Sequence, residues 1–297
     1  MSDMNILAIG ASRNIGYQSA VRLLEKGATV TFLLRSPAVF DNDAVIQRFV
    51  ATDKARLVKG DATSEEDLRL VWNAAGVVDA VVFSVGKSCL SFHSSRIMAL
   101  IRASNAGGTP SFSLTKGIVI DPPNLVTQCM LNLLCTLPKY EDAPQPKIVA
   151  ISSIGLTPTA HKALPLLMKP LYSMLDTPHK DKVGLERVLF HCAGWEWDAT
   201  SGEPEVEITG AGWQQRPGLP APGTLKHLLI VRPAWLTDGK SKADQVEREG
   251  RKDKLGYRYS EHEISTYGIS RADIAHFVAN SFNHWDELEN KAINVGY

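Results

Sequence analysis

The sequence predicts an α/β fold built on a doubly wound parallel sheet. Three observations carry this prediction. Short apolar runs alternate with stretches of helical periodicity along most of the chain, and these runs are apolar enough to be strands buried on both faces. The first run, "MNILAI", also ends at Gly10 directly before a helical pattern. Strands that alternate with helices pair in parallel through crossover connections, and this arrangement gives a doubly wound sheet.

The first half of the chain supplies four strands and three helices. In chain order these are a strand at 4–9, a helix at 15–26, a strand at 28–34, a helix at 44–51, a strand at 55–61, a helix over 64–76 and a strand at 78–86. Gly27 suits the end of the first helix, because glycine readily takes the left-handed conformation found there. Ser64 with Asp67 three residues later is a near-capping box and marks the start of the third helix.

The second half is less regular. Its expected elements are a helix at 123–137, a strand at 146–155, a helix at 179–194, a strand with its loop at 225–239, a helix at 270–282 and a strand at 291–297. Ser270, with Asp273 in the first turn, suits the start of the last helix. We expect one domain over 1–297 with a small C-terminal substrate-binding part. Irregular insertions near 87–118, 155–178 and 195–224 would lie on the substrate side.

Composition excludes several classes of function. The chain has 297 residues, 44% of them hydrophobic, and its 32 basic side chains equal its 32 acidic ones. It therefore has no net charge that would favour binding to nucleic acid or to a membrane surface. No apolar run reaches the roughly 18 residues of a membrane span, and no signal peptide is evident. The four cysteines form no C-x-x-C pair, so we expect no metal site. These features favour a cytoplasmic protein, either a monomer or a homodimer.

The stretch "NILAIGASRNIG" predicts a dinucleotide-binding turn. Gly10 permits a tight turn at the strand end, and Gly16 lets the helix pack closely on the strand. The start of the helix then offers unpaired N–H groups to a pyrophosphate. Arg13 and Asn14 stand between the glycines, and Asn tolerates the left-handed backbone better than other non-glycine residues.

The end of the second strand favours NADP(H). A site for NAD usually carries an acidic residue there, whereas this chain has Arg35 in "FLLRSP", 19 positions after Gly16. A guanidinium suits a 2′-phosphate, and Arg13 could hold it from the other side. The alternative is that both arginines are simply solvated. Asp61 and Ala62 follow the third strand, where an adenine edge would lie, but Asp61 could equally cap a turn.

These residues resemble the short-chain dehydrogenase/reductase superfamily, and more closely its atypical NmrA-like, NAD(P)-binding branch with a Rossmann-like fold. The segments that show the resemblance follow one another in the order typical of the family. They are "IGASRNIG", "LLRS", "GDAT", "VVFSVG", "VAISSIG", "HKDKVGLERVL", "LLIVRPAWLTDG" and "ISRADIAHFV". The resemblance implies a cofactor site lined by Gly10, Ser12, Arg13, Asn14, Ile15, Gly16, Arg35, Ser36, Asp61, Ala62, Ser84, Val85, Gly86, Ser152 and Lys182. It also implies that Pro233, Ala234 and Leu236 lie along the nicotinamide.

The catalytic residues depart from the family pattern. Typical members use a Ser and then a Tyr with a Lys four residues later, in which the phenol donates the proton. Here Lys182 matches the Lys, but Pro178 stands four residues before it, and Tyr172 is followed four positions later by Asp176. The candidate catalytic residues are therefore Ser153, Tyr172, Lys182 and His179. His179 has an alternative role as a cap or surface residue.

The leading hypothesis is an NADPH-dependent reductase of a small hydrophobic carbonyl or activated double bond. An apolar segment at 164–175 and the tryptophans Trp195, Trp197 and Trp213 would enclose such a substrate, or would merely seal the end of the sheet. Two alternatives stay open because the Tyr-x-x-x-Lys pair is missing. One is a non-catalytic NADP(H)-sensing regulator, and the other is a non-redox isomerase or cyclase. The mixed-charge run at 242–261 is expected to be a solvated face, with a lid role open.

Overall fold

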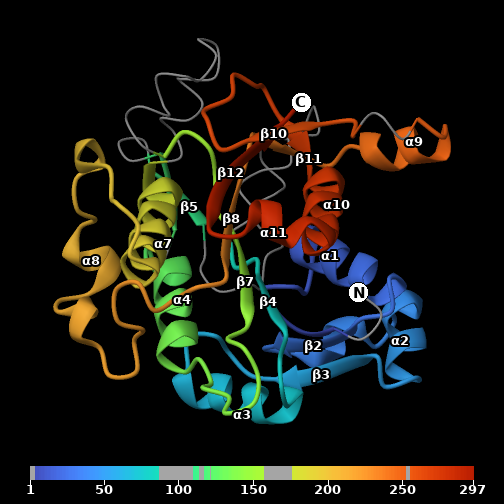
Figure 1. The fold of residues 1–297 in the computed structure, drawn as a ribbon, viewed down its shortest axis with the longest axis horizontal. Helices are drawn as coiled ribbons and strands as arrows, with labels where there is room; N and C mark the ends of the chain where they lie inside the picture. Colours follow the sequence, from blue (N-terminus) through green and yellow to red (C-terminus); the bar gives the residue numbers. More distant parts are fainter. Residues whose placement is uncertain (1–3, 87–109, 114–116, 121, 157–175, 252–254) are drawn as a thin grey trace.

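The computed structural model describes residues 4–86, 110–113, 117–120, 122–156, 176–251 and 255–297. Its centre is an eight-stranded sheet in the order β10-β12-β8-β7-β4-β1-β2-β3 (Figure 1). All neighbours in this sheet pair in parallel except β10 and β12. The strands are β1 Asn5–Ile9, β2 Thr29–Leu34, β3 Ala55–Lys59, β4 Ala80–Phe83, β7 Lys147–Ile151, β8 Leu228–Pro233, β10 Arg258–Ser260 and β12 Lys291–Gly296.

The order of the strands reverses between β1 and β4. From β1 the chain proceeds outward through β2 to β3, and it then crosses back so that β4 lies on the other side of β1. In open α/β sheets such a reversal leaves a crevice at the carboxyl ends of the strands, where ligands bind. The other described strands form two small sheets: β9 Leu236–Thr237 with β11 Ile269–Ser270, and β5 Pro110–Ser113 with β6 Gly117–Ile120.

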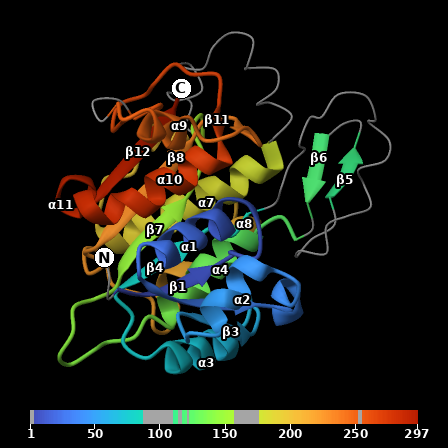
Figure 2. The same cartoon turned by 90° about the vertical axis from the view of Figure 1, so that its right-hand side faces the viewer.

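Helices cover both faces of the large sheet, which lies between them in Figure 1, and Figure 2 looks onto one of the two covered faces. The described α-helices are α1 Asn14–Glu25, α2 Ala44–Val50, α3 Glu65–Ala75, α4 Leu125–Cys135, α7 Asp176–Ala193, α8 Val206–Thr209, α9 Lys242–Arg248, α10 Arg271–Ser281 and α11 Trp285–Leu288. One buried core joins α1 and α10 to the sheet, and a second joins α3, α4 and α7 to the opposite face. Alternate residues of each strand feed the two cores, as the period of two requires.

The predicted alternation and the doubly wound parallel sheet are confirmed. Ser64 accepts a hydrogen bond from the N–H of Asp67, and Ser270 accepts one from the N–H of Asp273, so both expected caps form. The mixed-charge run at 242–261 was expected to be a solvated face, and the structure shows that it contains the helix α9 and the strand β10. Sequence reasoning missed them because their faces are mostly polar.

Residues 195–224 pack on the outer side of α4 and α7. The ring of Trp213 contacts the imidazole of His191, and the guanidinium of Arg216 binds the carboxylate of Glu65 and the side-chain oxygen of Asn132. Trp195 and Trp197 both pack edge-on against Phe190 of α7. This segment was expected on the substrate side; its described contacts are with α3, α4 and α7, and its place relative to a substrate stays a prediction.

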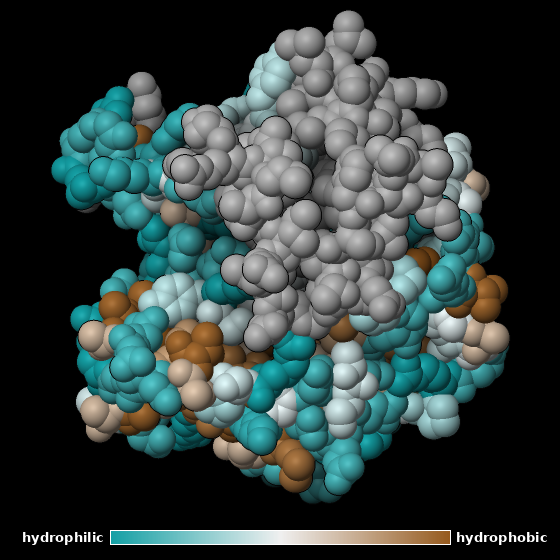
Figure 3. Space-filling model, turned by 180° about the vertical axis from the view of Figure 1, so that it is seen from behind, coloured by the Kyte–Doolittle hydropathy of each residue, from teal (hydrophilic) through white to brown (hydrophobic). Residues whose placement is uncertain are grey.

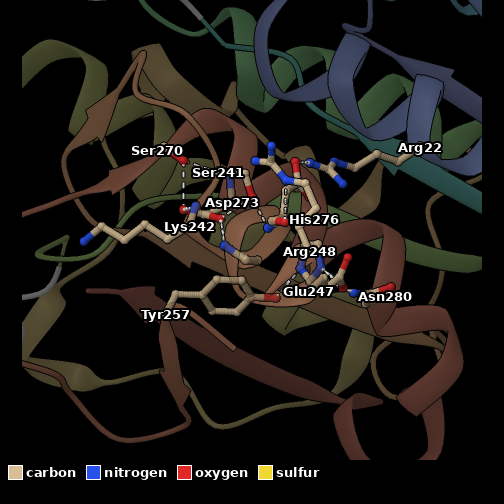
Figure 4. Close-up of polar contacts among 12 residues, drawn as sticks. Arg22, Ser241, Lys242, Glu247, Arg248, Tyr257, Ser270, Asp273, His276 and Asn280 are labelled. Atoms are coloured by element: carbon tan, nitrogen blue, oxygen red, sulfur yellow. Dashed lines mark hydrogen bonds and ion pairs between the residues drawn. The ribbon is translucent and has the colours of Figure 1, made fainter. Parts of the chain in front are cut away.

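Asp273 joins the start of α9 to the start of α10 (Figure 4). Its carboxylate is fully buried and accepts hydrogen bonds from five donors. The donors are Ser241 Oγ at 2.7 Å, Ala243 N at 3.0 Å, Lys242 N at 3.1 Å, Ser270 Oγ at 3.0 Å and Tyr297 Oη at 2.6 Å. The first N–H groups of α9 are thereby satisfied by a charge from another helix.

Helix α9 otherwise faces solvent. Of its side chains only Ala243 and Val246 are buried, and Arg22 of α1 binds Asp244 at 2.6 Å. In Figure 3 this projecting part of the molecule is hydrophilic, as the mixed-charge run predicts. Among the described residues, no helix combines the length and the apolar character needed to cross a membrane.

We expect Asp273→Asn to lower the free energy of unfolding by about 3 kcal/mol, because hydrogen bonds to a charged group contribute about 1.5–3 kcal/mol each. Burial opposes the charge of Asp273, but the hydrogen bonds outweigh it and hold the pKa of Asp273 below its ordinary value. A lowered pKa gives stability that is present at neutral pH and lost as the pH falls through the folded pKa.

Urea unfolding of wild type and D273N between pH 7 and pH 3 measures this difference, which should shrink toward the acid end. Asp286→Asn, an exposed change on α11, is the matched control and should change the free energy of unfolding little. A D273N variant as stable as wild type at pH 7 contradicts the assigned role of the carboxylate.

Candidate functional site

The turn between β1 and α1 lies directly against the end of β4. Gly10 has φ +77°, and a Cβ there would lie 2.6 Å from the backbone of Ser84 and Val85. A Cβ on Gly16 would lie 2.7 Å from the carbonyl oxygen of Gly10. Asn14 has φ +56°, the left-handed conformation that the sequence suggested for it. Both glycines are therefore required by close packing.

The start of α1 is open to an anion. The Arg13 side chain makes no capping hydrogen bond, and the first turn holds no acidic residue. The first N–H groups of the helix and its positive dipole end therefore favour a negative charge. Ser12, Arg13, Asn14 and Ile15 line a cavity of about 1060 Å³, whereas Gly16 is buried behind them and is not among the lining residues.

The ends of β2 and β3 border the same cavity. Arg35 and Ser36 are exposed there, and no carboxylate occupies the end of β2. Asp61 and Ala62 line the cavity after β3. The Asp61 carboxylate also accepts hydrogen bonds from the N–H and hydroxyl of Thr63, both at 2.9 Å, so the turn-capping role that the sequence left open is present.

The ends of β4, β7 and β8 complete the wall. The cavity is lined here by Ser84, Val85, Gly86, Ser152, Ser153, Pro233, Ala234, Trp235 and Leu236. The two serines differ in their hydroxyl groups. Ser153 Oγ donates to the carbonyl of Ile154 at 3.2 Å, whereas the buried Ser152 Oγ has no hydrogen-bond partner among the described residues. A buried hydroxyl without a partner costs free energy unless something else binds it, so Ser152 is the better candidate for contact with a ligand.

Lys182 reaches the same region from α7. Its ammonium group donates to the carbonyl of Ile151 at 2.6 Å and to the carbonyl of Val85 at 3.2 Å. Burial lowers the pKa of Lys182 to about 8, although Asp181 and Glu186 favour its charged form. A group with a pKa near neutrality is suited to proton transfer.

The other candidate catalytic residues differ in whether they line the cavity. His179 lies in the first part of α7 and lines the cavity. Pro178, four residues before Lys182, lines it as well and offers no donor. Tyr172, together with the whole apolar segment at 164–175, lies outside the described residues. A serine, a lysine and a histidine thus share one cavity.

Sequence reasoning missed Asp181 and Arg271, which also line the cavity. The carboxylate of Asp181 accepts hydrogen bonds from Val126 N at 2.9 Å and Thr127 N at 2.8 Å, and so caps α4 from a neighbouring helix. Arg271 is buried and binds Asp238 at 2.6 Å. No local signal marks either residue, because both partners are distant in sequence.

One group of possible metal ligands lies away from this cavity. Donor atoms of Asp244, Glu247 and His276 are within 4.8 Å of one another. Arg22 already binds Asp244, and the imidazole of His276 contacts Glu247 at 2.7 Å and the hydroxyl of Tyr257 at 2.9 Å (Figure 4). The arginine supplies the positive charge that a cation would bring, so this group is better described as an ion-pair network.

Comparison with known proteins supports the fold. The sequence matches no protein-family model. It is 24% identical over 314 aligned positions to "Reductase pytE" of Aspergillus terreus, covering 100% of this chain and 99% of that protein. The structure resembles ChuY, an anaerobillin reductase from Escherichia coli O157:H7, with TM-score 0.53 and 14% identity over 98% of this chain and 96% of that chain.

A second solved structure is similar to this chain to the same degree. A 3-oxoacyl (acyl-carrier-protein) reductase from Agrobacterium tumefaciens C58, with NADP bound, gives TM-score 0.53 at 18% identity over 99% of this chain and 94% of that chain. At such identities the likeness establishes the fold. The chain therefore has the Rossmann-like α/β fold that NAD(P)-binding reductases share, as its resemblance to short-chain dehydrogenases implied.

We expect Asn14→Gly to leave the free energy of unfolding within about 0.5 kcal/mol of wild type, because glycine takes positive φ without strain. Asn14→Ala should lower it by about 1 kcal/mol, since a Cβ without a local hydrogen-bonding group disfavours the left-handed conformation. Urea unfolding measures both. Asn73→Ala, in the exposed face of α3, is the matched control and should not destabilise. Equal stability of N14A and N14G would contradict the strained turn.

Proposed function

We propose that this protein is an NADPH-dependent reductase of a small hydrophobic carbonyl compound or activated double bond. The observation that carries the proposal is the composition of one cavity. The glycine turn, the arginine at the end of β2, the unpartnered Ser152 hydroxyl and the Lys182 ammonium group all border it. A regulator that only senses the cofactor needs the first two features, whereas the last two also suit proton transfer to a substrate.

The residues around the turn fit a dinucleotide. The open start of α1 suits a pyrophosphate, and the space that a Cβ on Gly10 would fill is taken by the backbone after β4, which keeps the turn compact. Arg13 and Arg35 suit a 2′-phosphate, because a guanidinium binds phosphate oxygens with two parallel hydrogen bonds. The nicotinamide of bound NADPH supplies a hydride to the substrate. Pro233, Ala234 and Leu236 are the residues proposed to lie along that ring.

Lys182 and Ser152 are proposed to supply the proton. Reduction of a carbonyl adds a hydride to carbon and a proton to oxygen, so the oxygen needs a donor within hydrogen-bond reach. Lys182 Nζ donates to two main-chain carbonyls, and the buried Ser152 hydroxyl, which has no partner among the described residues, is proposed to bind the substrate oxygen. In this proposal the lysine takes over the role that a tyrosine has in typical members of the family.

The described walls near these groups favour an apolar substrate. Pro122, Leu125, Val126, Trp235 and Leu236 are among the lining residues, and aliphatic and aromatic surfaces bind apolar molecules by excluding water. "Reductase pytE" and ChuY are both described as reductases, which agrees with this class of reaction. The proposal therefore names a hydrophobic aldehyde, ketone, quinone or enone.

NADPH oxidation at 340 nm with benzaldehyde, cyclohexenone and phenanthrenequinone tests the function, with NADPH and NADH binding titrated in parallel. We expect turnover with at least one acceptor and tighter binding of NADPH than of NADH. Arg35→Glu should weaken NADPH binding at least 10-fold and change NADH binding less than 3-fold, because the lost contact is to the 2′-phosphate.

Arg56→Glu on β3 is the matched control, since Arg56 is partly exposed and pairs with Asp53. It should leave both affinities unchanged. Tight NADPH binding without turnover on any acceptor would reject the reductase and favour a regulator. Preference for NADH would reject the roles given to Arg13 and Arg35.

The pH dependence of turnover tests Lys182. Because the pKa of Lys182 is lowered to about 8, its ammonium form is present at neutral pH and lost as the pH rises through that value. We therefore expect kcat to fall above about pH 8. Lys182→Met should remove this limb and lower kcat by about 10²–10⁴-fold, the usual contribution of general acid–base catalysis.

Ser152→Ala and Ser153→Ala form a matched pair for the same measurement. The first removes the unpartnered hydroxyl and should lower kcat at least 10-fold. The second removes a hydroxyl already bonded to the main chain and should change kcat less than 3-fold. The reverse result would return the catalytic role to Ser153, and an unchanged pH limb in K182M would exclude Lys182 as the proton source.

A further inference from the structure

A buried ion pair lies next to the proposed proton-donating groups. Arg232 of β8 donates from Nε to Glu186 Oε1 at 2.9 Å and from Nη2 to Oε2 at 2.6 Å. The side chain of Glu186 is 1% exposed and that of Arg232 is 15% exposed. Two parallel hydrogen bonds fix the relative orientation of the two groups as well as their distance.

The ion pair shares a face of the sheet with Ser152. Residues 148 and 150 of β7 and residues 228 and 230 of β8 pack in the core under α4 and α7, so Ser152 and Arg232, two positions further along, point to the same side. Ile151 pairs with Val231, and Ser152 N donates to the carbonyl of Val231 at 2.7 Å. Arg232 is therefore the immediate cross-strand neighbour of Ser152.

The same ion pair shares a face of α7 with Lys182. Glu186 follows Lys182 by four residues, and residues at this spacing lie on one side of a helix. Lys182 binds the carbonyls of Val85 after β4 and Ile151 of β7, and Glu186 binds Arg232 of β8. Two consecutive turns of α7 are thus attached to three neighbouring strand ends.

A purely structural purpose does not require charges here. The side chains one layer away in the same core, at 148, 150, 228 and 230, are apolar, and replacing a buried ion pair by well-packed apolar residues is often neutral or stabilising. Arg232 also faces a second carboxylate, that of Glu263, whose pKa is raised by burial while Arg232 opposes the rise. Unlike apolar side chains, the ion pair fixes the orientation of α7 relative to β8 and places fixed charges beside Lys182 and Ser152.

We propose that Glu186 and Arg232 are positioning residues, which hold Lys182 and Ser152 in register and keep the Lys182 ammonium group charged for proton donation. The inference rests on the proposed reductase function, because it assigns the pair to that reaction. The charged and titratable groups that face Lys182 are Asp181, Glu186 and, along the same cavity, His179. Of the two carboxylates that raise the pKa of Lys182, Asp181 has the larger effect and would remain after the loss of Glu186.

The first variant is Glu186→Gln, which keeps the shape of the side chain and removes its charge. We expect kcat for the panel acceptor of highest turnover to fall at least 10-fold, with KM and the Kd of NADPH within 3-fold of wild type. The alkaline limb of the kcat profile should move to lower pH, because loss of a negative neighbour disfavours the ammonium form.

E186Q removes the bidentate partner of Arg232, so lost stability must be separated from lost positioning. The double variant E186L/R232M removes both charges and should keep Tm within a few degrees of wild type while kcat stays at least 10-fold low. The pair R187Q/E203Q removes an ion pair on the outer side of the same helix and should change neither kcat nor the pH profile. If kcat recovers with Tm in the double variant, the pair is merely structural and the proposal is overturned.

Chemical labelling of Lys182 gives a measurement that does not depend on turnover. Acetic anhydride modifies the neutral amine, and peptide mass spectrometry follows modification of Lys182 against pH. In E186Q the midpoint should shift to lower pH, and in R187Q/E203Q it should match wild type. An unchanged midpoint in E186Q overturns the inference. Absence of turnover in wild type with a shifted midpoint in E186Q would instead reject the proposed reductase and leave the control of Lys182 by Glu186 standing.

Discussion

The contact between the turn after β1 and the end of β4 is the constraint on which the site depends. Gly10 is pressed against the backbone of Ser84 and Val85 with no room for a Cβ. This contact closes the turn at the position where the strand order reverses, so the start of α1 borders the crevice at the carboxyl ends of the strands. Gly16 has the same function one turn later, because it brings α1 onto the carbonyl of Gly10.

The attachment of α7 is the second requirement. Its core-facing side chains are apolar further along the helix, but its first described turns carry Asp181, Lys182 and Glu186 inward. Asp181 binds the start of α4, Lys182 binds the ends of β4 and β7, and Glu186 binds β8. Charged groups are costly to bury unless they are paired and hydrogen-bonded, and each of these three has such partners. The result is a helix whose orientation is specified at the site itself.

The similarity to solved reductases establishes the fold but not the reaction, which must be inferred from the residues of this chain. Folds of this class host many reactions, so function must be argued from the groups in the cavity. By the resemblance to short-chain dehydrogenases, Pro178 stands where those proteins carry a proton-donating tyrosine, and Lys182 matches the position of their lysine. The presence of Lys182 and Ser152 in one cavity is the basis on which we propose reduction, with the ammonium group of Lys182 as the expected origin of its pH dependence.

The sequence by itself determined the alternation of strands and helices, the caps at Ser64 and Ser270, the glycine turn and the basic residues beside it. These features are local: an apolar period, a cap three residues from its donor and a glycine before a helix are all written in neighbouring residues. The left-handed Asn14 belongs to the same class, since Asn tolerates this conformation better than other non-glycine residues.

Only the tertiary structure decided which of the two serines has an unpartnered hydroxyl, what Lys182 binds, and where residues 195–224 pack. It also brought Asp181 to α4, Glu186 to Arg232 and Asp273 to α9, which lie 30 to 55 residues apart in the chain. The physical reason is common to all of them. A side chain's direction relative to the sheet and the partner that satisfies its charge depend on which elements become neighbours, and that is set by strand order and packing rather than by adjacent residues.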